Sequence, residues 1–168
     1  MKRILVALFI FAATMLQMAI FSQFKIQAGK ADLLLLVIVA LGLQNEIPKV
    51  DKILFSFLAG IIIGFISAEP FWITVIIYTV AVYFCLILRE RLPQIPLVSM
   101  FFVSMVFMFF HLEIQSVYYQ FLGFQIEFQY SFQNIILPSL MINIIATLPV
   151  YFVVSEIRRL VYPSLEEM

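Results

Sequence analysis

Residues 53–70 read ILFSFLAGIIIGFISAEP, an apolar run in which a small residue recurs at every fourth position. The small residues are Ser56, Gly60, Gly64 and Ala68. Steps of four advance about 40° around a helix, so these residues form one seam that lacks side-chain bulk. Close packing along such seams is a main way in which helices associate in lipid. The seam therefore predicts either an internal packing surface of one bundle or a docking surface for another protein.

The composition around this stretch is that of a membrane protein. Hydrophobic residues make up 64% and charged residues 12% of the 168 residues, against roughly 45–50% and 25% in soluble domains. No polar stretch is long enough to fold a separate soluble core, so residues 1–168 are predicted to form a single transmembrane domain. Lys plus Arg and Asp plus Glu are both 10, and this balance argues against a nucleic-acid partner. The one cysteine, Cys85, lies in an apolar run and is expected to pack.

Six apolar segments predict an all-α integral membrane protein, a compact bundle of six transmembrane helices of which the second is short. The predicted spans are residues 4–24, 31–47, 53–68, 71–88, 95–115 and 133–154. The first follows Lys2 and Arg3 and has no small-x-small cleavage site, so it is expected to be an uncleaved anchor. The second reaches only about 26 Å as a helix, which predicts a short or tilted span. Asp32 at its start is expected to cap that helix near the headgroups rather than to bind an ion.

The basic residues of the loops orient the chain. With six spans and cytoplasmic N- and C-termini, eight basic residues lie inside and two, Lys25 and Lys30, lie outside; the inner set is Lys2, Arg3, Lys49, Lys52, Arg89, Arg91, Arg158 and Arg159. A five-span alternative, in which the second segment does not cross and the N-terminus is outside, gives the same ratio. We favour six spans because two basic residues before a long apolar run are the usual inside start. Both alternatives place Glu69 and Pro70 outside and the C-terminus inside.

The loop before the last span reads FQIEFQYSF over residues 124–132, and its apolar and polar residues alternate. Alternation is the period of a strand, so an extended segment lying at the membrane interface is predicted. Its apolar positions are Phe124, Ile126, Phe128, Tyr130 and Phe132. One interpretation is an aromatic belt at headgroup level. The other is an edge that pairs with a strand of a periplasmic partner.

The last span carries a polar seam, formed by Ser139, Asn143, Thr147 and Tyr151 at every fourth position. Such a stripe is expected to face the bundle interior, where interhelical hydrogen bonds specify orientation more than they add stability. Pro149 lies inside the same span and predicts a kink or a local loosening of the helix.

The chain lacks the residue patterns of an enzyme. Catalysis needs a nucleophile with a base, a pair of carboxylates in different environments, or a metal cluster. His111 is the one histidine, Cys85 lies on a different span, and the acidic residues fall mostly at span ends. His111 and Glu113 are two positions apart and do not share a helix face, so solvation at the interface is expected for them. We therefore predict no enzymatic activity, no cofactor and no metal site.

Three stretches resemble the bacterial rod shape-determining protein MreD family. ADLLLLVIVALGL (residues 31–43) looks like the family's second span, and AGIIIGFISAEPFW (residues 59–72), followed by Tyr78 and Tyr83, looks like its third and fourth. LPSLMINIIATLPVYFVV (residues 137–154), followed by Arg158 and Arg159, is similar to its last span. Order, spacing and length carry the resemblance, since no single motif is specific. Many members have an acidic residue where this chain has Gly64.

The resemblance implies a non-enzymatic scaffold of the cell-elongation machinery in the bacterial inner membrane. Such a protein binds the single-span protein MreC and links the MreB filament to the peptidoglycan synthases, an elongation glycosyltransferase and a class B penicillin-binding protein. Its surface also meets membrane lipids. The short inner loops place the expected partner contact at the seam of Ser56, Gly60, Gly64 and Ala68 and at the edge of residues 124–132.

An alternative comes from a different class of protein. Six short spans also resemble the substrate-binding subunits of energy-coupling-factor vitamin transporters. Those subunits carry an Ala-xxx-Ala seam in the first span, whereas here Ala7, Ala12, Ala13 and Ala19 are followed at the fourth position by Phe11, Leu16, Gln17 and Gln23. A ligand pocket would also need more convergent polar groups than Glu113, Glu127 and the glutamines provide.

Overall fold

The computed structural model describes the chain except for residues 1, 22, 24, 68–69, 92–95 and 164–168. Ala68 of the predicted seam and Glu69 therefore lie outside the described residues. The helices are α1 (Lys2–Leu16), α2 (Leu33–Leu43), α3 (Lys49–Ile66), α4 (Phe71–Arg91), α5 (Pro96–Phe121), α6 (Phe128–Ser131) and α7 (Leu137–Val161). Two π-helical turns, η1 (Gln17–Phe21) and η2 (Phe132–Ile136), follow α1 and precede α7. The strands β1 (Lys25–Ile26) and β2 (Gly29–Lys30) form an antiparallel hairpin between α1 and α2.

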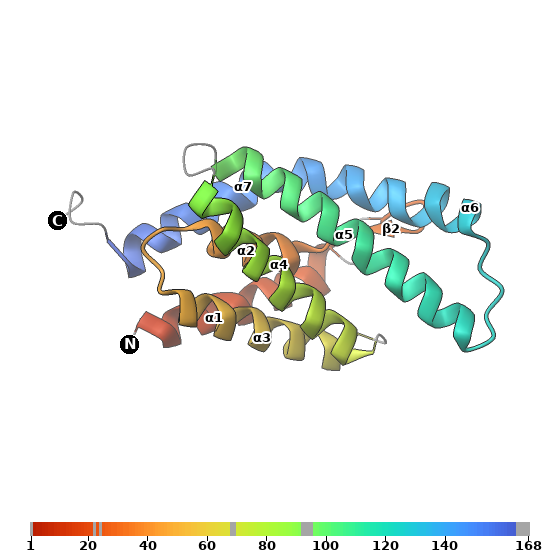
Figure 1. Cartoon of the computed structure of the whole chain (residues 1–168), viewed down its shortest axis with the longest axis horizontal. Coiled ribbons are helices and arrows are strands. Elements are labelled where there is room, and N and C mark those ends of the chain that lie inside the picture. The colour runs from red at the N-terminus through yellow and green to blue at the C-terminus, as the bar shows by residue number, and fades with distance from the viewer. Residues whose placement is uncertain (1, 22, 24, 68–69, 92–95, 164–168) are drawn as a thin grey trace.

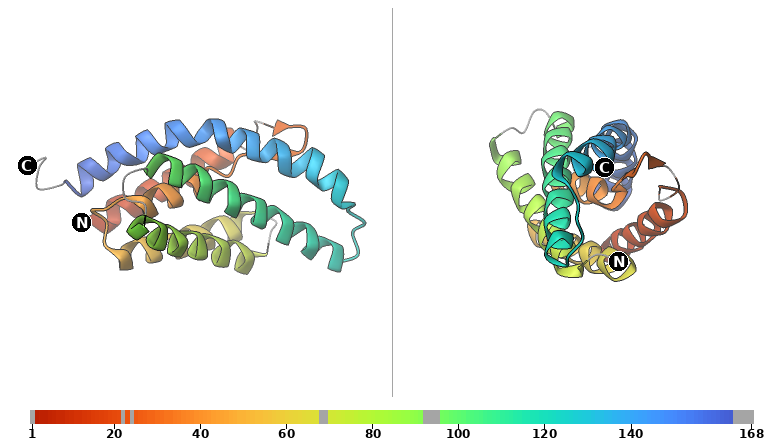
Figure 2. Two further views of the ribbon diagram at one scale, coloured as in Figure 1. Left: turned by 45° about the horizontal axis from the view of Figure 1, so that its top comes forward. Right: turned by 90° about the vertical axis from the view of Figure 1, so that its right-hand side faces the viewer.

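The helices lie side by side in an elongated bundle (Figures 1 and 2). The chain reverses direction between successive long helices, in the order α1, α2, α3, α4, α5 and α7. Both termini lie at the same end of this bundle, which we call the termini end. The β1–β2 hairpin lies toward the opposite end, which we call the hairpin end. The chain is thus an all-α protein of the membrane type.

Four helical stretches of the described residues are long and apolar enough to cross a membrane: Lys2–Ile20, Phe71–Glu90, Pro96–Phe121 and Phe128–Val161. Two predicted spans are not among them. The helix α3 has 18 residues but carries Lys49, Asp51 and Lys52 in its first turn. The helix α2 has only 11 residues. The number of crossings therefore remains a prediction.

The helix α2 lies in the middle of the bundle, and all 11 of its residues are buried. It packs against α1, α3, α4, α5 and α7. A helix that is apolar all round belongs inside a protein, because it has no polar face to turn toward water. Its length of about 16 Å is about half the thickness of a bilayer core. The second segment is therefore a central core helix, shorter than the predicted span of residues 31–47.

Both ends of α2 are capped by side chains of opposite charge. At the start, Asp32 Oδ1 accepts a hydrogen bond from the Leu35 amide at 3.0 Å, which confirms the predicted cap. At the other end, Lys52 reaches in from α3 and its Nζ donates to the Gly42 carbonyl at 2.8 Å and to the Gln44 carbonyl. Lys52 is only 1% exposed, although the sequence places it in a loop at the membrane surface.

The small-residue seam of α3 packs against α4 of the same chain. A Cβ atom at Gly60 would lie 2.7 Å from Val75 Cα, and one at Gly64 would lie 2.7 Å from Phe71 Cα. Ser56 is buried as well. Because α4 fills the space that the glycines leave open, the prediction of a partner-docking surface at Ser56, Gly60 and Gly64 is corrected to internal packing.

Residues 124–132 do not form the predicted strand, and their second half is helical. Residues 124–127 have no regular structure, and α6 begins at Phe128 and continues through η2 into α7. The rings of Phe128 and Phe132, one helical turn apart, stack with centroids at 6.0 Å. The predicted extended segment is therefore wrong for Phe128, Tyr130 and Phe132, because the last helix begins earlier than its apolar run suggests. Phe124, Phe128 and Tyr130 are exposed and Ile126 is partly exposed.

Ion pairs tie the helices together at the termini end. Arg3 of α1 lies 2.8 Å from the buried Asp51 of α3, and Asp51 also accepts a hydrogen bond from the Tyr162 hydroxyl at 3.3 Å. Burial raises the pKa of Tyr162, and the Asp51 carboxylate adds to this effect. The exposed Lys49 and Glu90 form a further pair at 2.7 Å between α3 and α4. This end of the bundle thus gathers the basic residues that begin α1 and α3.

Replacing Gly60 with alanine should destabilise the bundle by about 1–3 kcal/mol, because the added methyl group forces α3 away from α4. Alanine favours helix over glycine by about 1 kcal/mol, so propensity alone predicts the opposite sign. Thermal unfolding in detergent measures the difference. Ala19→Val, at an exposed small residue, is the control, and a Gly60→Ala protein that melts at or above the wild-type temperature would contradict this packing.

Replacing Lys52 with methionine should destabilise the chain by about 1–3 kcal/mol, because the Gly42 carbonyl loses its Lys52 donor and the Gln44 carbonyl keeps only Arg89, at 3.3 Å. The matched control is Lys49→Met, one turn earlier on α3. Lys49 is exposed and paired with Glu90, and such surface pairs contribute about 0–1 kcal/mol. Equal melting temperatures for the two variants would show that Lys52 does not cap α2.

Candidate functional site

Asp32 is the centre of a polar cluster inside the bundle. Its side chain is buried, with the residue 6% exposed. Besides the Leu35 amide, its Oδ1 accepts a hydrogen bond from the Tyr78 hydroxyl of α4 at 2.7 Å. Its Oδ2 lies 3.6 Å from Nδ1 of His111 on α5. Tyr78 of α4 and His111 of α5 thus enclose this carboxylate within the bundle.

The histidine of this cluster lies between a glutamine of its own helix and Asp32. Nε2 of His111 lies 3.1 Å from the amide nitrogen of Gln115, one turn along α5. The other ring nitrogen, Nδ1, faces Asp32. His111 is 5% exposed and its ring meets that of Tyr78 edge to face, with centroids at 6.1 Å. The predicted interfacial solvation of His111 is thus replaced by a place inside the bundle.

The polar seam of α7 binds the backbone of the residues that lead into α2. Ser139, Asn143 and Thr147 are buried and Tyr151 is partly exposed, so the expectation that the stripe faces the interior is confirmed for the first three. The Asn143 side-chain oxygen accepts from the Asp32 amide at 3.1 Å. The Ser139 hydroxyl accepts from the Lys30 amide at 3.0 Å. The seam therefore fixes the hairpin and the start of α2 against α7.

A cavity of about 470 Å³ opens beside this cluster, toward the hairpin end. We call it the polar cavity. It is lined from α4 by Thr74 and Tyr78, from α5 by His111, Gln115 and Tyr119, and from the hairpin side by Lys30 and Asp32; its other polar lining residues include Gln17, Ser67 and Ser139. Apolar side chains such as Ile63, Met108 and Leu112 form the rest of the wall. Nearly every long element of the bundle thus contributes a residue to one site.

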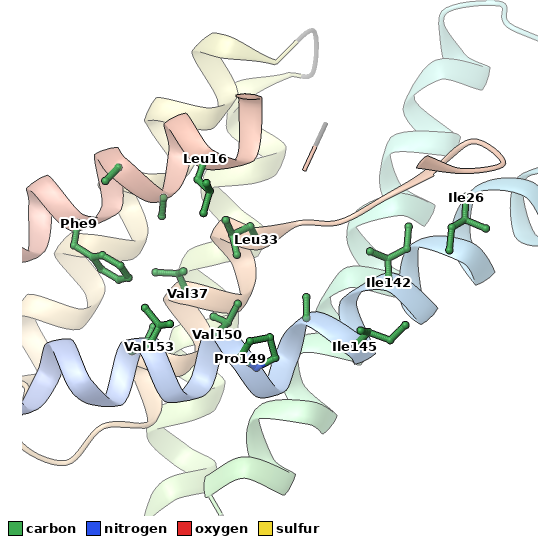
Figure 3. A pocket seen from close by; sticks show the side chains of 14 residues that line it. Phe9, Leu16, Ile26, Leu33, Val37, Ile142, Ile145, Pro149, Val150 and Val153 are labelled. Carbon is green, nitrogen blue, oxygen red and sulfur yellow. The ribbon is translucent and has the colours of Figure 1, made fainter. Parts of the chain in front are cut away.

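A second hollow of about 770 Å³ lies between α1 and α7, and Figure 3 shows its side chains. We call it the apolar groove. It is lined by Phe9, Ala12, Ala13, Leu16, Ile26, Leu33, Val37, Ile142, Ile145, Ala146, Pro149, Val150, Val153 and Val154. The residue types are apolar throughout, and α2 forms the floor through Leu33 and Val37. The groove can accept hydrocarbon but offers no polar side chain to orient a soluble ligand.

The polar cavity joins residues that sequence reasoning kept apart. Asp32 and His111 are far apart in the sequence and on different helices, and Tyr78 was singled out only for the resemblance it carries. One signal could have found the cluster, because an ionisable residue within an apolar segment is a functional candidate by default. The partner candidates Phe124, Phe128 and Tyr130 lie outside this cavity, and Gly60 and Gly64 are covered by α4.

The arrangement can bind and orient a polar group but contains no activated nucleophile among its described lining residues. The hydroxyl of Tyr78 donates to Asp32, and Nδ1 of His111 also faces that carboxylate. Among the residues that the structure describes, no group of three or more His, Cys, Asp or Glu side chains could hold a metal ion. Cys85, which is buried, lies on α4 facing the Val39 carbonyl of α2.

Comparisons with known proteins gave no match. No family model, no curated protein and no solved structure is matched by this chain. A functional proposal for this chain therefore rests on its sequence patterns and on the geometry of its described residues.

Replacing Tyr78 with phenylalanine should destabilise the protein by about 1.5–3 kcal/mol, because the buried carboxylate of Asp32 loses a charged-group hydrogen bond. Tyr83→Phe is the matched control, since Tyr83 lies on the same helix and is 59% exposed. Thermal unfolding of both variants in one detergent measures the effect. A Tyr78→Phe protein as stable as Tyr83→Phe would show that the hydroxyl does not support Asp32.

Proposed function

We propose that this chain is a non-enzymatic scaffold of the bacterial cell-elongation machinery, embedded in the inner membrane with both termini in the cytoplasm. In this proposal it binds an MreC-like single-span protein and, through it, connects the MreB filament to the peptidoglycan synthases. Support comes from the order and spacing of the three stretches that resemble the MreD family. The basic residues gathered at the termini end fit a cytoplasmic location for that end.

The observation that carries the proposal further is the apolar groove between α1 and α7. We assign to it the transmembrane helix of the single-span partner. The small residues Ala12, Ala13 and Ala146 line the groove and leave room for a backbone or for bulky side chains of an incoming helix. The seam of α3 is already occupied by α4, so the groove replaces it as the intramembrane docking surface of this proposal.

Filling the groove should weaken partner binding. Ala12→Phe places a ring in the groove from an exposed position of α1, and we expect co-purification of an MreC-like partner to fall at least about tenfold, as for loss of a central interface contact. Ile76→Phe is the control, because Ile76 is exposed on α4 and lies outside the groove lining. Undiminished co-purification with a correctly inserted Ala12→Phe protein would exclude the groove as the docking surface.

A second candidate function is the substrate-binding subunit of an energy-coupling-factor vitamin transporter. The polar cavity favours it, because Asp32, Tyr78, His111 and Gln115 converge there from three elements. The missing Ala-xxx-Ala seam of the first span speaks against it. Thermal stabilisation by a panel of vitamins, without pull-down of a single-span partner, would favour this candidate over the scaffold.

A further inference from the structure

We propose that the polar cavity is a binding site for the ammonium end of a small zwitterionic ligand, with the Asp32 carboxylate as its counter-ion. This site lies apart from the apolar groove that the scaffold proposal uses, and the inference does not depend on that proposal. The chemical class is a primary amine that also carries an anionic group, as in an ethanolamine phosphate.

The buried carboxylate of Asp32 would be stabilised by a cation. Two neutral donors of the described residues meet its Oδ1, the Tyr78 hydroxyl and the Leu35 amide. Oδ1 already accepts two hydrogen bonds, whereas the contact of Oδ2 with His111 is 3.6 Å long, beyond hydrogen-bond distance. A buried carboxylate without a full positive partner is costly, and a bound cation removes that cost. Asp32 lines the polar cavity, which has room for such a cation.

The size of the cavity favours an organic cation over a metal ion. Its 470 Å³ lies within the range of about 300–1,000 Å³ typical of small-molecule sites. A bare monovalent ion would leave most of this volume to water. The wall combines the aromatic rings of Tyr78 and Tyr119 with the aliphatic side chains of Ile63 and Leu112. These rings and methyl groups can pack against the carbon atoms of an organic amine, and the faces of the rings also attract its positive charge.

An unpartnered hydroxyl points independently to a ligand. Thr74 lines the cavity, is 1% exposed, and its Oγ1 has no hydrogen-bond partner within the described part of the chain. Buried hydroxyls are normally satisfied, so this one has the capacity for a hydrogen bond with a bound molecule. Thr74 lies one helical turn before Tyr78 on α4. A ligand whose ammonium meets Asp32 can therefore also reach the Thr74 hydroxyl.

Lys30 is the residue that would pair with the anionic end of the ligand. It lines the same cavity, but it is exposed and belongs to the hairpin at the edge of the bundle. An amine with no second charge would be repelled by Lys30 on entry, whereas a phosphate or carboxylate would pair with it. The two charges of the site, one buried and one exposed, thus match a molecule with its ammonium at one end and its anionic group at the other.

A primary ammonium group joined to a phosphate can come from two sources, free phosphoethanolamine and the headgroup of phosphatidylethanolamine. The purified full chain is tested with both probes. Thermal shift with added phosphoethanolamine reports the free compound, and native mass spectrometry with phosphatidylethanolamine reports the lipid. Phosphatidylcholine is the control lipid, because its quaternary ammonium has the same charge and phosphate but no N–H group to donate to Asp32. Binding of either ethanolamine probe in preference to phosphatidylcholine supports the proposal and identifies the source.

Asp32→Asn keeps the cap and the shape of the side chain but removes its charge, and we expect at least about tenfold weaker binding of the ethanolamine probe. Glu113→Gln is the matched control, since it removes a carboxylate from α5 outside the cavity lining and should bind like the wild type. Lys30→Gln, at an exposed side chain, should weaken binding about threefold to fivefold. Wild-type protein that binds neither probe, or an Asp32→Asn protein that binds as tightly as Glu113→Gln, overturns the proposal. If Asp32→Asn does not fold, unchanged binding by Lys30→Gln overturns it instead.

Discussion

The short helix α2 imposes the constraint on which the rest of the bundle depends. A helix has unpaired amides at its start and unpaired carbonyls at its end, and these groups must find partners wherever water is excluded. Helices that cross a membrane end in the headgroups, but α2 has 11 residues, all buried, and begins and ends inside the protein. Its partners are a carboxylate at the start and an ammonium group at the end, Asp32 and Lys52. Each charge also matches the sign that the helix dipole favours at that end.

A carboxylate cap inside the bundle needs hydrogen-bond partners of its own. For Asp32, α4 supplies the Tyr78 hydroxyl, and His111 of α5 also faces the carboxylate. The extended chain before Asp32 also needs partners, and Asn143 and Ser139 of α7 accept from its amides. One short helix therefore accounts for polar side chains on three of the long helices. The close approach of α3 to α4 at Gly60 and Gly64 completes the bundle beside it.

Much of this fold could be predicted from the sequence, because apolar runs bounded by charges and prolines determine where the long helices lie. The interior orientation of Ser139, Asn143 and Thr147 followed from their period alone. Other features depend on contacts between distant residues, which periodicity does not encode. A seam of small residues is the same whether α4 or a foreign helix covers it, so the partner of Gly60 could not be derived. The alternation at residues 124–132 fits a strand, yet the final helix extends back to Phe128. Asp32 and His111 meet only once α2 lies at the centre of the bundle.

The two caps of α2 both pair the free backbone groups of a buried helix end, but they differ in how fully their own charge is paired. This difference distinguishes the proposed binding site from a structural cap. Lys52 is 1% exposed and directs its ammonium group at the carbonyls of Gly42 and Gln44, so its charge is satisfied by the helix end itself. Asp32 gives one oxygen to the helix and to Tyr78, while its other oxygen lies beyond hydrogen-bond distance of His111, and the residue lines a cavity. A purely structural cap would be as closed as the one at Lys52, because an incompletely paired buried charge lowers stability. The cavity next to Asp32 therefore gives a ligand access to the buried charge, as we propose, whereas the cap at Lys52 is closed by the helix itself.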